Sequence, residues 1–292
     1  MAITASQVSE LRRLTSCGMM DCKKALQEAE GDLEKAADLL RKKGMMKAAK
    51  KADRIAAEGV VVVREDQAGK SVVILEINSE TDFVARDQNF LRFTEALSGL
   101  AMTQQIASLE QLMASPLSDG KTADQVRQEL IIKLGENINV RRLQAIKSDH
   151  VLGVYVHGHR IGVVVELEGG DANLAKDLAM HIAASKPSVI TSEQIPEEVV
   201  AKEKEIFTEQ AKASGAKEEI IEKMVNGKLK KYFDEVCLLR QPFVKSPDLT
   251  VAKLLEQSKA KVLSFIRFEL GEGIEKETTN FAEEVQAQVQ GK

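Results

Sequence analysis

Few residues in this sequence have the types and spacing that catalysis requires. The Gly-rich Lys-Ser/Thr loop that binds phosphate, the HExxH zinc motif and the GxSxG nucleophile motif are all absent. Cys17 and Cys22 lie five residues apart, but no other cysteine or histidine is near enough in sequence to complete a zinc site. His157 and His159 flank a glycine, and two ligands do not hold a metal ion. The sequence therefore predicts a protein that is not an enzyme and has no metal centre or cofactor.

Two further residues with reactive side chains are expected to pack rather than react. Cys22 falls on the apolar face of a predicted helix, where a small core residue is the simplest interpretation. His181 lies on a predicted helix that buries Leu178 and Ile182. For His181 we therefore favour a packing or interface role over catalysis.

A basic tract could bind nucleic acid, but its setting argues for another role. It lacks the interleaved aromatic residues on which bases stack. The whole chain has 45 acidic and 41 basic residues and a net charge of −4, which argues against a dedicated nucleic-acid protein. An RNA or ribosome contact stays the alternative to a solvated helix that joins two bodies. The tract consists of Lys42, Lys43, Lys47, Lys50, Lys51 and Arg54.

The segment Thr81-Asp82-Phe83-Val84-Ala85-Arg86 places a carboxylate beside a large ring where a polar loop is expected. Two interpretations of Phe83 are open. The ring could turn inward and cover the core, or it could be exposed on a rigid loop as a binding anchor.

The elements that position these residues begin with short helices in residues 1 to about 55. Thr4 and Gln7 form a capping box at the start of the first helix, and Val8, Leu11 and Leu14 follow at helical spacing. Breaks near Gly18 and Gly31 separate three helices, and Gly44 is expected to end the third. Residues 45–57 are expected to form a helical tether. Each helix is too short to persist alone, so the three should pack together as a small module.

The next part of the chain contains one pattern twice. Residues 60–64 and 71–77 predict a β-hairpin, and residues 151–156 and 161–167 predict another. A polar loop and an apolar-faced helix follow each hairpin, and Thr122 opens a further helix that Gly135 ends. We interpret the repeat as an internal duplication. The fold class is therefore α+β, with a duplicated core of small antiparallel sheets covered by helices.

The last third of the chain predicts an inserted helical hairpin and a C-terminal arm. Residues 196–232 are rich in Glu and Lys and turn at Ser214-Gly215, residues 262–270 predict a strand, and a final helix carries Phe281, Val285 and Val289. The expected units are 1–55 (helical module and tether), 56–147 (first core half), 148–190 with 233–270 (second core half), 191–232 (helical hairpin) and 271–292 (C-terminal module).

Several segments of the chain resemble the elongation factor Ts family, and they are spread over nearly its whole length. They are Leu11–Thr15, Gly18–Leu26, Thr81–Arg86, Gly135–Ile138, Met180–Ala184 with Lys186-Pro187, Gln241–Phe243, and Phe265–Phe268 before Gly271–Ile274. The chain departs from the family at Asp87, where the family often has Asn, and at Ser16-Cys17, which replace smaller residues. Asp87 could change how the loop is capped.

The resemblance implies a fold and a function. The first three helices would form a module similar to ubiquitin-associated domains. The chain would be a guanine-nucleotide exchange factor that binds elongation factor Tu with GDP, displaces Mg²⁺ and promotes GDP release, so that GTP can bind during translation elongation. Asp82 and Phe83, with Thr81 and Val84, would enter the partner's GTPase domain beside its magnesium and phosphate site. Arg12, Met19, Met20 and His181 would make further contacts, and the second core half would meet the partner's distal β-domain.

The composition of the chain predicts the cellular compartment of the protein. The three cysteines, the absence of Trp and an N-terminus without a basic stretch or an apolar segment predict a cytoplasmic protein. The longest apolar runs have the length of a strand, so no membrane span is expected. A homodimer and a ubiquitin-like recognition module stay open as alternatives for its interactions, and no direct binding of nucleic acid is expected.

Overall fold

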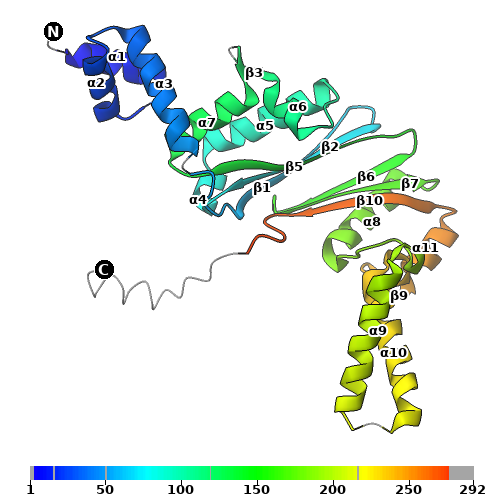
Figure 1. Cartoon of the computed structure of the whole chain (residues 1–292). Helices are drawn as coiled ribbons and strands as arrows, with labels where there is room; N and C mark the ends of the chain where they lie inside the picture. Colours follow the sequence, from blue (N-terminus) through cyan, green and yellow to red (C-terminus); the bar gives the residue numbers. More distant parts are fainter. Residues whose placement is uncertain (1–2, 16, 50, 119, 216, 276–292) are drawn as a thin grey trace.

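The computed structural model describes residues 3–275 apart from residues 16, 50, 119 and 216. At its centre, two three-stranded antiparallel sheets face each other, and helices cover the outer face of each sheet (Figure 1). The fold of this part of the chain is therefore α+β, as predicted, with four layers in the order helices, sheet, sheet, helices.

The first sheet has the strand order β1-β2-β5, where the strands are β1 (Glu58–Glu65), β2 (Ser71–Ser79) and β5 (Ile138–Lys147). The predicted first hairpin is confirmed, since β1 pairs with β2. The third strand, β5, was not predicted from the sequence. The short helix α4 (Asp82–Ala85) follows β2, and the covering helices are α5 (Gln88–Thr103), α6 (Leu109–Ala114) and α7 (Ala123–Leu134). Between α6 and α7, β3 (Pro116–Ser118) pairs with β4 (Lys121–Thr122).

Both faces of the central strand β2 are covered, and its first half contains the apolar run Val72–Leu75. Leu75 and Ile77 belong to the core cluster that the covering helices share, whereas Val72 and Ile74 belong to the cluster between the two sheets. Beyond Ile74 on this inner face, Glu76 and Asn78 are fully buried. The inner face of β2 therefore changes from apolar to polar as the strand approaches α4.

The second sheet repeats this topology with the order β10-β7-β6, where the strands are β6 (Val151–His157), β7 (Ile161–Glu168) and β10 (Lys261–Glu269). The second hairpin is confirmed by the pairing of β6 with β7. In both sheets a hairpin is followed by helices and then by a strand antiparallel to the hairpin's second strand. The covering helices of the second sheet are α8 (Ala172–Ser185) and α11 (Val251–Gln257).

The two sheets pack through an apolar cluster that includes Val61, Leu152 and Phe268. Gly162 on β7 permits their close approach, because a Cβ there would lie only 2.7 Å from Val61 Cγ1. The backbone N–H of Val61 also donates to the carbonyl oxygen of His159, in the turn between β6 and β7, at 2.7 Å. The two halves thus share an apolar cluster between their sheets, beside the separate cluster that each half has of its own.

The N-terminal helices share a separate buried cluster that includes Leu11, Cys22 and Leu40. They are α1 (Ala5–Thr15), α2 (Met19–Glu28) and α3 (Leu33–Ala49). The prediction that Gly44 ends the third helix is wrong, because α3 continues past it. Gly44 is buried against Ile132 of α7, so the missing side chain brings α3 close to α7. The predicted helical tether is also wrong beyond α3, since residues 51–54 form a turn and residues 55–57 have no regular secondary structure.

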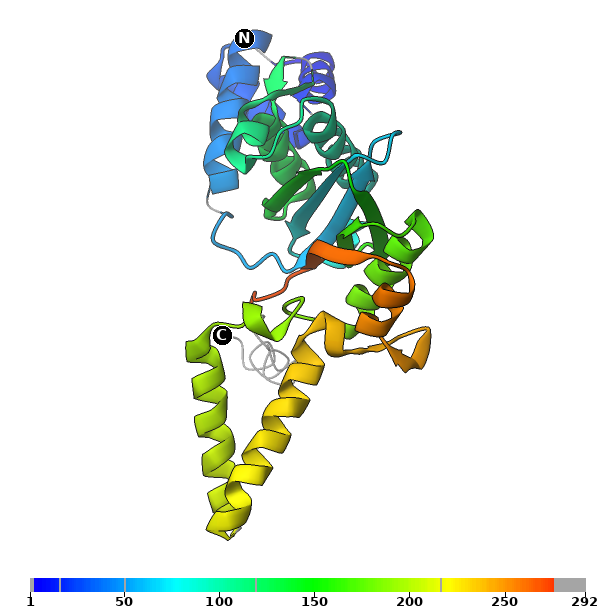
Figure 2. The ribbon, with the colours of Figure 1, turned by 90° about the vertical axis from the view of Figure 1, so that its right-hand side faces the viewer.

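Two long helices project from the second half at the end of the molecule opposite to the N-terminal helices (Figure 2). They are α9 (Glu197–Ala213) and α10 (Glu218–Val236), which pack on each other through Ala211 and Val225. The remaining short elements are the 3₁₀ helices η1 (Ser192–Gln194) and η2 (Leu238–Arg240) and the paired strands β8 (Pro242–Phe243) and β9 (Ser246–Thr250). The predicted final helix with Phe281, Val285 and Val289 lies outside the described residues.

Candidate functional site

The candidate site is the short helix α4, which the chain enters directly from the end of β2. Thr81 is its N-cap, and the Thr81 hydroxyl accepts a hydrogen bond from the backbone N–H of Val84 at 3.4 Å. Val84 and Ala85 are 8% exposed and pack into the core beneath α5. Because neighbouring residues of a helix point in different directions, this anchoring turns Phe83 away from the core.

The Phe83 ring is 82% exposed, which is the largest exposure among the large apolar side chains of the described residues. The interpretation in which this ring turns inward to cover the core is therefore wrong. Leu91, on the next helix, is 42% exposed. An isolated aromatic ring on a helix that is otherwise anchored has the form of a binding anchor.

Charged residues flank the ring on α4 and at the start of α5. Asp82 forms an ion pair with Arg86, one helical turn later, at 2.9 Å. Asp87 is the N-cap of α5, and its carboxylate accepts hydrogen bonds from the backbone N–H groups of Asn89 and Phe90. The side-chain hydrogen bond from Asn89 is the largest effect that lowers the pKa of Asp87. Asp87 therefore caps α5 as an ionised group.

Sequence reasoning missed the residue that supports the start of α4. Both carboxylate oxygens of Glu136 accept hydrogen bonds from Thr81, one from the backbone N–H at 3.0 Å and one from the hydroxyl at 2.7 Å. Ser79 holds the same residue from the other side, because its hydroxyl donates to the carbonyl oxygen of Thr81 at 2.8 Å. The available signal was the segment Gly135–Ile138, which carries part of the family resemblance but suggested no role.

The N-terminal helices present a second exposed group of the predicted site residues. Met19 and Met20, at the start of α2, are 57% and 65% exposed, and Arg12 on α1 is exposed as well. Leu14 lies exposed on the same module. Cys22, by contrast, is fully buried, in agreement with its predicted core role. The module therefore carries an apolar surface that its own core does not use.

His181 is completely buried, in agreement with its predicted packing role, and its contact with a partner stays a prediction. Its Nδ1 accepts a hydrogen bond from the backbone N–H of Val244 at 3.2 Å, and Nε2 lies 2.9 Å from Gln241 Oε1. Since Nδ1 is an acceptor, the ring is neutral and its proton is on Nε2. Burial lowers the pKa of His181, against the opposing effect of the Gln241 hydrogen bond. The residue joins α8 to the chain that returns from α10.

The two histidines considered as metal ligands, His157 and His159, lie in different elements. His157 ends β6, while His159 lies in the following turn with a φ of 56°. No group of three or more potential metal-ligating residues occurs in the described part of the chain.

The basic tract is partly occupied by contacts within the chain. Lys43 pairs with Glu28, Lys51 donates to the carbonyl oxygen of Gly135, and Arg54 lies 3.5 Å from Glu80. Three of the six side chains thus have partners within the chain, while those of Lys43 and Arg54 are 47% and 54% exposed. The alternative of an RNA contact through this tract stays a prediction.

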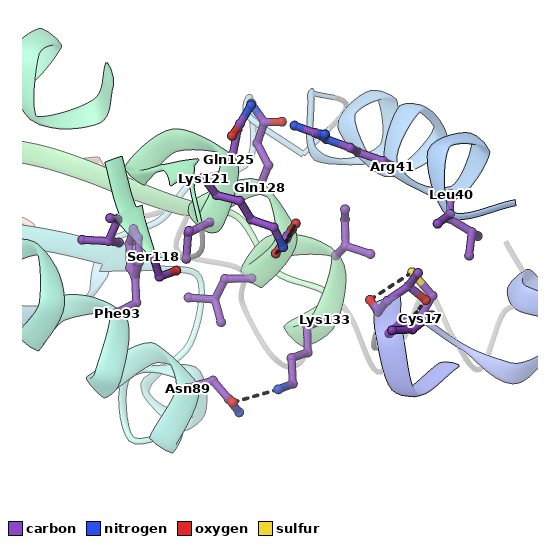
Figure 3. A pocket seen from close by; sticks show the side chains of 18 of the residues that line it. Cys17, Leu40, Arg41, Asn89, Phe93, Ser118, Lys121, Gln125, Gln128 and Lys133 are labelled. Atoms are coloured by element: carbon purple, nitrogen blue, oxygen red, sulfur yellow. Dashed lines mark hydrogen bonds and ion pairs between the residues drawn. The ribbon is translucent and has the colours of Figure 1, made fainter. Parts of the chain in front are cut away.

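A cavity of about 610 Å³ lies between the N-terminal helices and the first core half. Leu40 and Arg41 of α3 line one side of it, and Gln125 and Gln128 of α7 line the other (Figure 3). Lys133 and Asn89 both line the cavity, and Lys133 Nζ donates to the Asn89 amide oxygen at 2.8 Å. The cavity marks the junction between module and core.

Comparison with known proteins connects these features to a family. The family model described as "Elongation factor TS" matches residues 80–272. Proteins named elongation factor Ts are similar along their whole length: that of Methylococcus capsulatus is 54% identical over 290 residues, covering 99% of both chains. That of Thioalkalivibrio sulfidiphilus is 54% identical over 293 residues, with 100% of both covered, and that of Legionella pneumophila strain Lens is 52% identical over 287, with 98% covered.

None of the helices in the described residues is long and apolar enough to cross a membrane. With a family model that matches more than half of its length and relatives that match nearly all of it, the chain belongs to the elongation factor Ts family of translation elongation factors.

Proposed function

We propose that this chain is a guanine-nucleotide exchange factor for elongation factor Tu. It binds the partner with GDP, displaces the bound Mg²⁺ and promotes GDP release, so that GTP can bind during translation elongation in the cytoplasm. Family membership supports this proposal, and the exposed ring of Phe83 on the anchored helix α4 is the observation that carries it. The chain performs no chemical step of its own in this reaction.

The proposed mechanism is a wedge. A bound nucleotide is held by contacts between its phosphates and the backbone and by a bridging magnesium ion, so a small displacement there weakens several interactions together. Phe83 enters between helices of the partner's GTPase domain and moves them, and the magnesium coordination is lost. Asp82, already paired with Arg86, holds α4 or bonds to the displaced helix.

The other site residues have supporting roles in this proposal. Thr81 caps α4, and the buried Val84 anchors it, so the ring is carried by a fixed element. Arg12, Met19 and Met20 give the N-terminal module, which we propose is similar to ubiquitin-associated domains, a surface for the same partner. The second core half meets the partner's distal β-domain, with His181 contributing through packing.

Thermodynamic linkage sets a condition on the mechanism. If the factor lowers the affinity of the partner for GDP, then GDP lowers the affinity of the partner for the factor by the same ratio. The factor must therefore bind nucleotide-free partner more tightly than the GDP form.

The experiment that tests the proposal is stopped-flow measurement of fluorescent GDP release from elongation factor Tu. Phe83→Ala is expected to slow catalysed release about thirtyfold, because truncation of an aromatic anchor costs about 2 kcal/mol. Ile220→Ala is the matched control, since Ile220 is an exposed apolar residue on α10, and it is expected to leave release unchanged. If the Phe83→Ala variant binds normally and releases GDP at the wild-type rate, the wedge is excluded. If the wild-type chain does not accelerate GDP release, the function is excluded.

A further inference from the structure

We infer that Glu136 is a positioning residue for Phe83: it sets the direction of the ring by orienting the N-cap of α4. This inference rests on the proposed function and adds a residue to it. Glu136 lies on the turn formed by residues 135–137, between α7 and β5, more than fifty residues from Phe83 in sequence.

The first step in the argument is the double hydrogen bond between Glu136 and Thr81. The Glu136 carboxylate accepts hydrogen bonds from the backbone N–H and from the hydroxyl of Thr81, at 3.0 and 2.7 Å. A hydroxyl has one hydrogen and two acceptor lone pairs. Once its hydrogen is donated to Glu136, its lone pairs are free for the N–H of Val84, which completes the N-cap. Glu136 therefore fixes both the backbone and the rotamer of the capping residue.

The second step is that α4 cannot hold its own orientation without attachments to the rest of the protein. A helix of four residues is far below the length at which helices persist alone, so its orientation depends on its attachments. Those attachments are the buried side chains of Val84 and Ala85 and the cap at Thr81. Phe83 is almost fully exposed and adds little support of its own. Without Glu136, Thr81 keeps the hydrogen bond from Ser79 and the two bonds within α4, from the backbone N–H groups of Val84 and Ala85.

The third step is that the turn carrying Glu136 is itself held firmly. Asn137 is 5% exposed, and its side-chain amide donates to the carbonyl oxygens of Ala52 and Arg54 at 3.2 and 2.8 Å. Its backbone N–H donates to Glu80 at 2.5 Å. Residues 52–54 belong to the tether from the N-terminal module. The support for Phe83 and the end of the tether therefore share one turn.

The test compares two substitutions at Glu136 in the full chain. Glu136→Ala removes both bonds and is expected to lower kcat/KM for catalysed GDP release at least about tenfold, as expected for a displaced contact group. Glu136→Gln can accept from the Thr81 N–H through its amide oxygen and donate to the Thr81 hydroxyl, so we expect it to retain most activity. Hydrogen exchange at the Val84 amide should rise in the first variant only.

A double-mutant cycle separates positioning from general damage. If Glu136 acts through the ring, Glu136→Ala adds little to the defect of Phe83→Ala, whereas independent effects would multiply. Thr81→Val, which keeps the side-chain shape and the backbone N–H, is expected to give a partial loss. Glu129→Ala is the matched control, because it removes an α7 carboxylate that pairs with Lys121 rather than with α4.

The outcomes distinguish this inference from the proposed function. If Glu136→Ala catalyses exchange at the wild-type rate while Phe83→Ala is slow, the role of Glu136 is overturned and the proposed function stands. Multiplicative defects in the cycle, or equal losses in the Ala and Gln variants, would also overturn it. Wild-type exchange by Phe83→Ala would instead overturn the proposed wedge.

Discussion

Phe83 and Val84 are adjacent apolar residues with opposite surroundings, since one is 82% and the other 8% exposed. The difference arises from the geometry of α4, which can bury only one side against the core beneath α5. At the residue scale, the candidate site thus depends on the direction in which the Phe83 side chain points. The same side chain on the other face of α4 would be an ordinary core residue. His181 shows the reverse case, a polar residue of the family segments that is buried and fully hydrogen-bonded.

The buried neutral His181 leads to a prediction about pH. Burial lowers its pKa in the folded protein below the ordinary value of 6.5, so the unfolded chain takes up the proton first as the pH falls. We expect the free energy of unfolding to be largest above pH 6.5 and to decrease from pH 7.5 to 5.5. Urea unfolding of the wild type and of His181→Gln across this range measures the effect. The variant should show a smaller slope, and equal slopes would contradict the prediction.

At the scale of elements, a β-bulge in β5 lets two consecutive arginines reach the same buried carboxylate. The pairing of β2 with β5 shifts between Glu76 and Ile77, so that Arg141 is the extra residue of a β-bulge. Both Arg141 and Arg142 then reach the buried carboxylate of Glu76, at 3.0 and 2.5 Å. Regular alternation would direct two consecutive arginines to opposite faces.

The contact between the two sheets gives the second prediction. A Cβ at Gly162 would lie 2.7, 2.9 and 3.0 Å from Val61, Val63 and Ile74, so Gly162→Ala overfills the space between the sheets. We expect the free energy of unfolding to fall by about 1–3 kcal/mol. Gly227→Ala is the matched control on α10, where nothing lies within 4 Å, and it should raise stability by about 1 kcal/mol. Thermal unfolding of both variants measures the difference, and the same sign in both would refute this account of the interface.

At the scale of the whole molecule, Glu76 connects the first half to the end of β10. Its carboxylate also accepts from the backbone N–H of Gly271 at 2.9 Å, and Arg142 donates to the carbonyl oxygen of Glu269. Burial acts to raise the pKa of Glu76, but the hydrogen bonds from Gly271 and Asn78 and the two arginines outweigh it, so the pKa is lowered. An ionised glutamate therefore holds the two halves together.

We predict that Glu76→Gln destabilises the whole molecule at neutral pH by about 3 kcal/mol, because two arginines lose the charge that compensates them. A lowered pKa means that the contribution of Glu76 is present above its ordinary value of 4.5 and is lost as the pH falls through its folded value. The difference between wild type and variant should therefore shrink at acid pH. Chemical unfolding at pH 7 and below pH 4.5 checks this, and a constant difference would be incompatible with an ionised Glu76.

The duplicated hairpins and the first three helices could be predicted because their signals are local. Alternating and continuous apolar runs mark strands, and capping boxes such as Thr122 with Gln125 mark helix starts. The strand β5 was missed because its residues include two arginines, a glutamine and a lysine, and only their pairing with Glu76 and the sheet edge explains them. Gly44 was misjudged because a glycine that ends a helix and one that admits a neighbouring helix are the same residue in sequence.

The sequence by itself determined the fold class and the repeated unit of this protein, and its family resemblance drew attention to residues 81–86. The local pattern left open whether Phe83 faces the core or the solvent, because both arrangements satisfy it, and the resemblance only implied an exposed ring. Only the tertiary structure decided this, by burying Val84 and Ala85 and by bringing Glu136 to Thr81 from another part of the chain. Contacts between residues distant in sequence set the direction of a side chain, and periodicity carries no information about them.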